Sequence, residues 1–240
     1  MTFLPRPSPC GKFHISNDGK RTHNSEFDWV LPFHNPGLAP VGDSSGSYHI
    51  CLDGNPAYSA RFERTFGFYC DLAAVEKEGF FFHIHPNGSP AYTDRWNWCG
   101  NFQQQLCVVR NEIGEYYHIK TDGTLIPGGP HSYAGDFREG FAVVRGKDGL
   151  CRHIDGEGKY IHDFTFLDLD VFHKGFARAR DERGWHFIDC QGHDVLNGQR
   201  FLEIEPFYNG QSLVKKLWGQ QAVITEKGRI VAIDRKSTRL

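Results

Sequence analysis

Short apolar runs alternate with glycine-containing turns along most of the chain. In the segment 140–175, residues 141–145 (Phe-Ala-Val-Val-Arg) are apolar and β-branched, and a Lys-Asp-Gly turn follows them. Residues 150–155 form a second apolar run, and residues 159–162 form a shorter third one. Runs of this length and composition, bounded by turn residues, are typical of β-strands. Because no apolar period of about 3.6 residues is sustained, the pattern predicts an all-β protein in which helix is scarce.

The same pattern recurs every 34 to 36 residues. In the clearest copies a His-Ile pair is followed four residues later by a glycine, as in His49-Ile50 and Gly54. Two further sets of residues, one small and one aromatic, recur with the same spacing; we call each such set a sequence ladder. Three ladders in one phase predict a tandem array of about seven repeats of 35 residues. The glycines are Gly19, Gly54, Gly88, Gly123, Gly158, Gly192 and Gly228; the small residues are Ala39, Ala73, Cys107, Ala142, Ala177 and Ser212; the aromatic residues are Phe68, Phe102, Phe137, Phe172 and Phe207.

Each repeat is expected to form a β-hairpin or a three-stranded sheet. The Asp-Gly and Asn-Gly pairs that close the first four repeats favour a tight turn with positive φ at both central residues. Strand alternation places Tyr48 and Ile50 on one face and His49 on the other. The small-residue ladder indicates that a neighbouring strand approaches closely, because a larger side chain would overpack there. Since one repeat cannot bury its own apolar face, the repeats are expected to stack into one cooperative array.

The repeat length also bears on whether the array is open or closed. A repeat of 35 residues accommodates three strands, whereas blades of WD-type propellers contain four strands in about 40–45 residues. The first copy begins at its second strand, residues 12–15, while the last copy is complete. An open, twisted array is therefore favoured over a closed β-propeller. Residues 1–36 are interpreted as a degenerate N-terminal capping repeat, residues 37–234 as the array, and residues 235–240 as an atypical tail that resembles translated sequencing-adapter sequence rather than native protein.

The segment 172–192 carries the most regular copy of the repeat. It reads Phe-His-Lys-Gly-Phe-Ala at its start, continues with Gly184-Trp185-His-Phe-Ile-Asp, and closes on a glycine. This sequence resembles the repeat of the bacterial WG-repeat family, and similar copies cover residues 11 to about 233. The resemblance implies an all-β repeat module that serves as an interaction region or as an accessory region of other domains, including enzymes. The Gly-Trp pair is intact only here, since the place of the tryptophan is taken elsewhere by Phe81, Tyr116 and Cys151.

Composition narrows the classes of function. The formal net charge is −2, which removes the electrostatic footprint of a nucleic-acid-binding protein. No apolar run reaches the length of about 18 residues that a membrane span needs, and the N-terminus lacks the apolar segment of a signal peptide. The seven cysteines are an odd number without a Cys-x-x-Cys pair, which argues against a disulfide framework and a zinc knuckle. We therefore expect a cytoplasmic protein without nucleic-acid or membrane partners.

The histidine that recurs in the repeats is the sharpest candidate for chemistry. In an array curved into a ring, these imidazoles would converge and bind a metal ion, with His83, His85, His118 and His153 as the best candidates. The alternative is a histidine hydrogen-bonded within its own repeat, too far from the next for a shared ion, whose ligands lie within about 2.0–2.1 Å. This structural role is favoured. No P-loop, nucleophile elbow or zinc-protease motif occurs, so neither catalytic residues nor a cofactor are expected.

The sequence favours a binding scaffold over an enzyme. Repetition without any singular chemical motif suits a non-catalytic module that recognises a protein or peptide over an extended surface. Trp96, Trp98, Tyr133 and Trp185 are the candidates for that surface, although core packing is the simpler role for aromatic residues at repeat positions. The alternative function is an accessory N-terminal region of a larger enzyme, with a covalently linked catalytic domain beyond residue 234.

Overall fold

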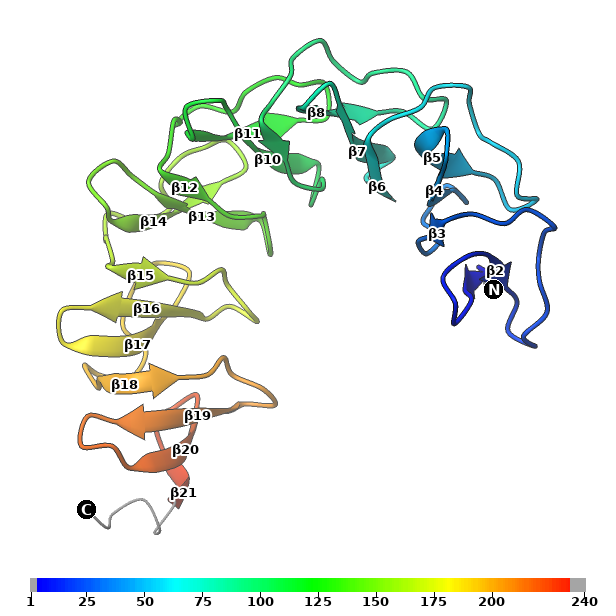
Figure 1. Ribbon diagram of the computed structural model, residues 1–240. Coiled ribbons are helices and arrows are strands. Elements are labelled where there is room, and N and C mark those ends of the chain that lie inside the picture. The colour runs from blue at the N-terminus through cyan, green and yellow to red at the C-terminus, as the bar shows by residue number, and fades with distance from the viewer. Residues whose placement is uncertain (1–3, 234–240) are drawn as a thin grey trace. The chain divides into compact units, whose positions relative to one another are not determined.

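The computed structural model describes residues 4–233, so the tail 235–240 lies outside the described residues. Within them the chain forms strands and turns and no helix, which confirms the all-β prediction. The described part accordingly holds no helix long and apolar enough to cross a membrane. The chain divides into two compact units, residues 1–125 and 126–240. Figure 1 shows that each unit is built from small antiparallel sheets.

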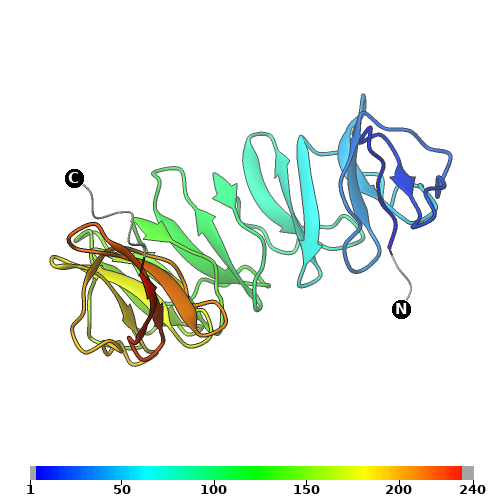
Figure 2. The same ribbon diagram turned by 90° about the horizontal axis from the view of Figure 1, so that it is seen from below.

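The first unit contains one two-stranded sheet and three three-stranded sheets. In each three-stranded sheet a short lead strand pairs with a middle strand, which forms a hairpin with a third strand. Figure 2 shows these sheets in chain order from blue to green. The strands are β1 (Arg6–Pro7), β2 (His14–Ile15), β3 (Trp29–Val30), β4 (Ala39–Asp43), β5 (Gly46–Ile50), β6 (Arg64–Tyr69), β7 (Leu72–Lys77), β8 (Phe80–Ile84), β9 (Trp98–Cys99), β10 (Leu106–Arg110) and β11 (Tyr116–Lys120).

The second unit contains a three-stranded sheet of the same plan and one seven-stranded sheet. The larger sheet joins two repeats, because the third strand of one pairs with the lead strand of the next at Trp185 and Phe201. In other repeats a single β-bridge makes the corresponding link, as between Phe81 and Trp96. The strands are β12 (Tyr133–Ala134), β13 (Phe141–Arg145), β14 (Cys151–Asp155), β15 (Asp168–Leu169), β16 (Ala177–Asp181), β17 (Gly184–Ile188), β18 (Phe201–Ile204), β19 (Gln211–Lys216), β20 (Gln221–Thr225) and β21 (Ile230–Ile233).

The hairpin of the repeat was predicted correctly, but the third strand was not. The predicted strands 141–145 and 150–155 correspond to β13 and β14. The predicted strand 159–162 is wrong, because it contributes only an isolated bridge from Tyr160 to Ile154. The third member of the sheet is the short lead strand β12 instead. The chain leaves the sheet after the bridge because the following residues turn inward, and His162 is buried.

The turns that close the repeats differ from the predicted type. The closing glycines have positive φ, for example 84° at Gly54 and 83° at Gly88, whereas the Asp or Asn before them does not. Such a turn is a type I turn followed by a left-handed glycine. The side chain of Asp53 supports it by accepting a hydrogen bond from the N–H of Asn55 (3.0 Å). Two successive positive φ values occur instead in the turn before the middle strand, as at Glu139 (52°) and Gly140 (86°).

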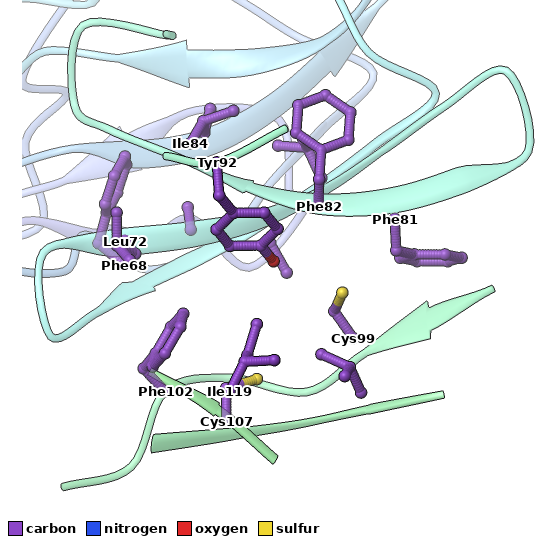
Figure 3. Close-up of a cluster of buried hydrophobic side chains, with 14 of the residues drawn as sticks. Phe68, Leu72, Phe81, Phe82, Ile84, Tyr92, Cys99, Phe102, Cys107 and Ile119 are labelled. Carbon is purple, nitrogen blue, oxygen red and sulfur yellow. The ribbon is translucent and has the colours of Figure 1, made fainter. Parts of the chain in front are cut away.

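Two of the three sequence ladders form the core. The small residues are at most 2% exposed, and the aromatic ladder is buried as well. Figure 3 shows one cluster in the first unit, which includes Phe68, Ile84, Tyr92 and Phe102. His49 and Ile50, which the alternation of strand β5 places on opposite faces, are both fully buried. Both faces of this strand are covered because the repeats pack on one another as well as within themselves.

Candidate functional site

A histidine on the third strand is buried and held by the same contacts in successive repeats. In His83, Nε2 donates a hydrogen bond to the carbonyl oxygen of Gly100 (3.0 Å), and Nδ1 accepts one from the hydroxyl of Tyr92 (2.5 Å). Because a carbonyl oxygen only accepts, Nε2 carries the proton. The imidazole also packs against Phe102, with ring centroids 4.6 Å apart. His49 makes the same contacts with the Phe66 carbonyl (2.8 Å), the Tyr58 hydroxyl and the Phe68 ring (4.6 Å).

Two copies use a second histidine in place of the tyrosine. In His153, Nε2 donates to the carbonyl oxygen of Asp170 (2.8 Å), and Nδ1 lies 3.3 Å from Nε2 of His162. Since Nδ1 of His153 must accept, His162 carries its proton on Nε2. Its own Nδ1 is then a buried acceptor with no partner among residues 4–233. His14 repeats the arrangement with the Leu31 carbonyl (2.8 Å) and His23 (3.2 Å).

Burial sets the charge of these imidazoles. It lowers the pKa of His49, His83 and His153 to about 4, and the hydrogen bonds to backbone carbonyls only partly oppose this effect. The rings are therefore neutral at physiological pH. With Nε2 protonated and Nδ1 engaged as an acceptor, neither nitrogen of these rings presents a free lone pair to a metal ion.

The structure does not gather the four predicted metal ligands into one site. His83 on β8 and His118 on β11 occupy the same position of successive repeats and are buried, whereas His85 follows the end of β8 and is exposed. His153 takes the equivalent position on β14 of the second unit. Across residues 4–233, no three His, Cys, Asp or Glu side chains lie together so as to hold a metal ion. The contacts of the histidine ladder are those of a structural element.

Sequence reasoning missed the partners of the histidines. Each partner stands nine residues after its histidine, and this constant spacing was the available signal. The closing glycine of the following repeat lies directly against the partner. A Cβ atom on Gly88 would stand 2.6 Å from the ring of Tyr58, and one on Gly123 would stand 2.7 Å from Tyr92. The glycine ladder therefore marks the contact between one repeat and the next, in addition to a turn.

The four aromatic candidates occupy different environments. Trp96 is half-buried against the core of the first unit, while Trp98 on β9 is 37% exposed. Tyr133 on β12 is 49% exposed, and Trp185 on β17 is half-buried in the second unit. Of the four, Trp185 lines a groove of the second unit that is described below.

Two grooves lie on either side of the turn between β16 and β17. The larger, about 490 Å³, has Trp185 and Phe201 among its lining residues, together with Leu202 and Leu217. The smaller, about 330 Å³, extends toward the preceding repeat. Leu202 and Leu217 are 45% and 50% exposed, so apolar surface is open to solvent in the larger groove. The two grooves share Asp181, Glu182 and Arg183; the smaller is otherwise lined by Leu150, Thr165 and Leu167.

Arginines beside the larger groove are held in place by carboxylates. Arg178 and Arg180 lie 5.9 Å and 5.8 Å from the ring of Trp185. Arg178 is paired with the carboxylate of Asp170, and Arg180 lies 3.9 Å from that of Asp168. Two paired cations thus lie beside the ring of Trp185, an arrangement that favours a rigid aromatic surface.

Asp181 anchors the turn that separates the two grooves. Its Oδ1 accepts the N–H of Arg183 (2.8 Å), and its Oδ2 lies 2.7 Å from the guanidinium of Arg200. Burial acts to raise the pKa of Asp181, but the hydrogen bonds from Arg200 and Arg183 outweigh it and hold that pKa well below its usual value. The turn that forms the shared wall of the grooves is therefore held by the Asp181 carboxylate, which stays ionised at neutral pH.

Comparison with known proteins shows similarity of fold but assigns no function. No family model and no curated protein matches the sequence. Among solved structures, a eukaryotic initiation factor matches with a TM-score of 0.57 and 11% identity, over 98% of this chain and 74% of that one. BamB from Moraxella catarrhalis matches with a TM-score of 0.47 and 10% identity over 98% and 85% of the two chains. The initiation factor is similar in fold alone, and its likeness agrees with the all-β class that the strands define.

Proposed function

We propose that this chain is a non-catalytic binding module that holds a protein or peptide partner in the grooves beside Trp185. The observation that carries the proposal is the pair of adjoining grooves, which share one braced turn and expose leucine and tryptophan side chains. Volumes of 330 and 490 Å³ fit side chains of a bound segment. Two grooves from successive repeats suit an extended segment that runs from one repeat to the next.

The composition of the larger groove supports binding of a protein. Tryptophan and arginine are enriched among the residues that dominate interface energies, and aromatic anchors work best when their geometry is fixed. Trp185 lies next to two paired arginines, and Leu202 and Leu217 supply exposed apolar area in the same groove. Burying that area against a partner would contribute favourably at about 25 cal/mol per Å².

Membership of the bacterial WG-repeat family and a cytoplasmic location belong to the same proposal. The intact Gly184-Trp185 pair supports the first, because both of its residues line the larger groove. The seven cysteines, all free, support a reducing compartment.

Site-specific photo-crosslinking tests the proposed function. A benzoylphenylalanine placed at Leu202 should capture a partner in a lysate of the source cell, and the same group at exposed Leu125 in the first unit should not. The captured partner is then purified and titrated calorimetrically. We expect Leu217→Lys to weaken its binding at least about tenfold, since the exposed apolar area of Leu217 would be lost from the groove, and Leu125→Lys to leave it unchanged. Wild-type affinity in Leu217→Lys would refute the assignment of the groove.

A further inference from the structure

A second surface, on the β9–β10–β11 sheet of the first unit, contains an arginine between two aromatic residues. Arg110 on the middle strand is the register partner of Trp98 on the lead strand and of Tyr116 on the third strand. Register partners in antiparallel sheets share one face and have Cβ atoms about 4.5–5.5 Å apart. The guanidinium lies 5.9 Å from the ring of Tyr116. The three side chains therefore form a row across one face of the sheet.

Two of the equivalent rows in other repeats contain an acid opposite the base, whereas Tyr133 is opposite Arg145 and Trp29 is opposite Gly42 in two others. In the β6–β7 pair, Arg64 is opposite Glu76, and their charged groups are 3.2 Å apart. In the β15–β16 pair, Asp168 is opposite Arg180, at 3.9 Å. In the row of Arg110, a tryptophan occupies the lead-strand position that Arg64 and Asp168 occupy in those two rows.

Arg110 is therefore a cation without an internal counter-charge. Among residues 4–233 it forms no ion pair, although it is half-buried. The acids nearest in sequence are Glu112 and Glu115 in and after the turn that follows β10, and Glu115 accepts a hydrogen bond from the Tyr117 hydroxyl (3.0 Å). A guanidinium presents five donors in a plane and pairs most strongly with a carboxylate, especially where aromatic rings exclude water.

The surroundings of the row indicate what carries that carboxylate. Trp98 is 37% exposed, and Ile113 in the turn between β10 and β11 is 74% exposed. Apolar surface beside an unpaired arginine complements an acidic side chain that has apolar neighbours in its own chain. Tryptophan, tyrosine and arginine together are also the residue types most enriched at the energetic centres of protein interfaces.

We propose that the row of Trp98, Arg110 and Tyr116 binds a glutamate or aspartate side chain in an acidic, partly apolar segment of a partner protein. The inference rests on the proposed function only in taking the partner to be a protein. The row lies in the first unit and the grooves beside Trp185 lie in the second, so a variant of one leaves the other intact. Failure of either proposal is thus distinguishable from failure of the other.

Fluorescence anisotropy with two labelled peptides tests the proposal on the full chain. One peptide alternates leucine with glutamate, and the second replaces every glutamate by glutamine. We expect the glutamate peptide to bind at least about tenfold tighter, since a charged acceptor roughly doubles the strength of each hydrogen bond to a guanidinium. Arg110→Gln should reduce its affinity to that of the glutamine peptide. Arg64→Gln is the matched control and should change nothing, because Arg64 is already paired with Glu76.

A second variant supplies the missing carboxylate from within the protein. Trp98→Asp reproduces the acid–base row formed by Asp168 and Arg180, so the new side chain should pair with Arg110 and abolish binding of the glutamate peptide. An unchanged circular dichroism spectrum shows that the fold is kept. Equal affinity for the two peptides, wild-type affinity in either variant, or equal loss in Arg64→Gln would overturn the proposal. Competition by free glutamate at the peptide's own concentration would overturn the assignment to a protein segment.

Discussion

Acid is expected to unfold this protein through its buried histidines. Burial lowers the pKa of His49, His83 and His153 to about 4 in the folded protein, against about 6.5 in an unfolded chain. A base whose pKa is lower when folded takes up protons on unfolding once the pH falls below 6.5. Stability is therefore complete above pH 6.5 and is lost progressively as the pH falls toward 4.

The size of the effect follows from the two pKa values. At pH 5, an unfolded histidine is almost fully protonated and a folded one is almost neutral, which costs about 2 kcal/mol for each of the three residues. The total of about 6 kcal/mol is comparable with the whole free energy of unfolding of an ordinary domain, about 5–15 kcal/mol. His49 and His83 lie in the first unit and His153 in the second, so these residues contribute about 4 kcal/mol to the loss in the first unit and about 2 to that in the second.

Urea unfolding followed by tryptophan fluorescence between pH 5 and pH 8 measures this loss. The free energy of unfolding should fall between pH 7 and pH 5 by about 2 kcal/mol less in His83→Gln than in the wild type. This holds even if the substitution destabilises the protein at pH 7. His85 is two residues away and exposed, so His85→Gln is the control. Its free energy of unfolding should fall between pH 7 and pH 5 by as much as that of the wild type. An equal free energy of unfolding at pH 5 and pH 7 would refute the reasoning, as would folded-state titration of these rings near pH 6.5 by NMR.

Four further predictions concern the turns, the core and the shape of the array. Gln105 has a φ of 69°, so Gln105→Gly should raise the free energy of unfolding by about 0.5–1 kcal/mol; a decrease would exclude the left-handed conformation. Gly88→Ala should cost at least about 2 kcal/mol, because its Cβ would meet the ring of Tyr58. Gly149→Ala is the control for strain alone, since φ is 80° and nothing lies within 4 Å, and it should cost about 1 kcal/mol in the same urea assay. Ala142→Phe should lower the melting temperature strongly, because Ala142 is fully buried, and an unchanged value would refute the packing assignment. The open array expected from the repeat length predicts a radius of gyration above about 18 Å by X-ray scattering, the value for a compact chain of this length, and a value at or below it would favour a closed ring.

The sequence was sufficient to predict the local elements of the repeat. Turn residues and β-branched runs fix hairpins such as the one formed by β13 and β14, because those preferences act over a few residues. The lead strands could not be predicted in the same way, since each has two to six residues and is defined by its partner. The strand expected at residues 159–162 failed for the same reason, because pairing there competes with the inward packing of His162.

The candidate sites show which side chains a repeat pattern can and cannot assign. A ladder such as that of the histidines identifies equivalent positions, and equivalence by itself favours a shared structural role. The contacts of His83 and His153 bear this out, because both rings use the same two nitrogens for the same two kinds of partner. Departures from the ladder are more informative about binding. Trp98 stands where one other repeat places Asp168 opposite Arg180, and Trp185 fills a position that Cys151 occupies one repeat earlier. A repeat protein that varies its surface on a constant core can change its partner without changing its fold, so the positions that break the repeat are the ones to test first for binding.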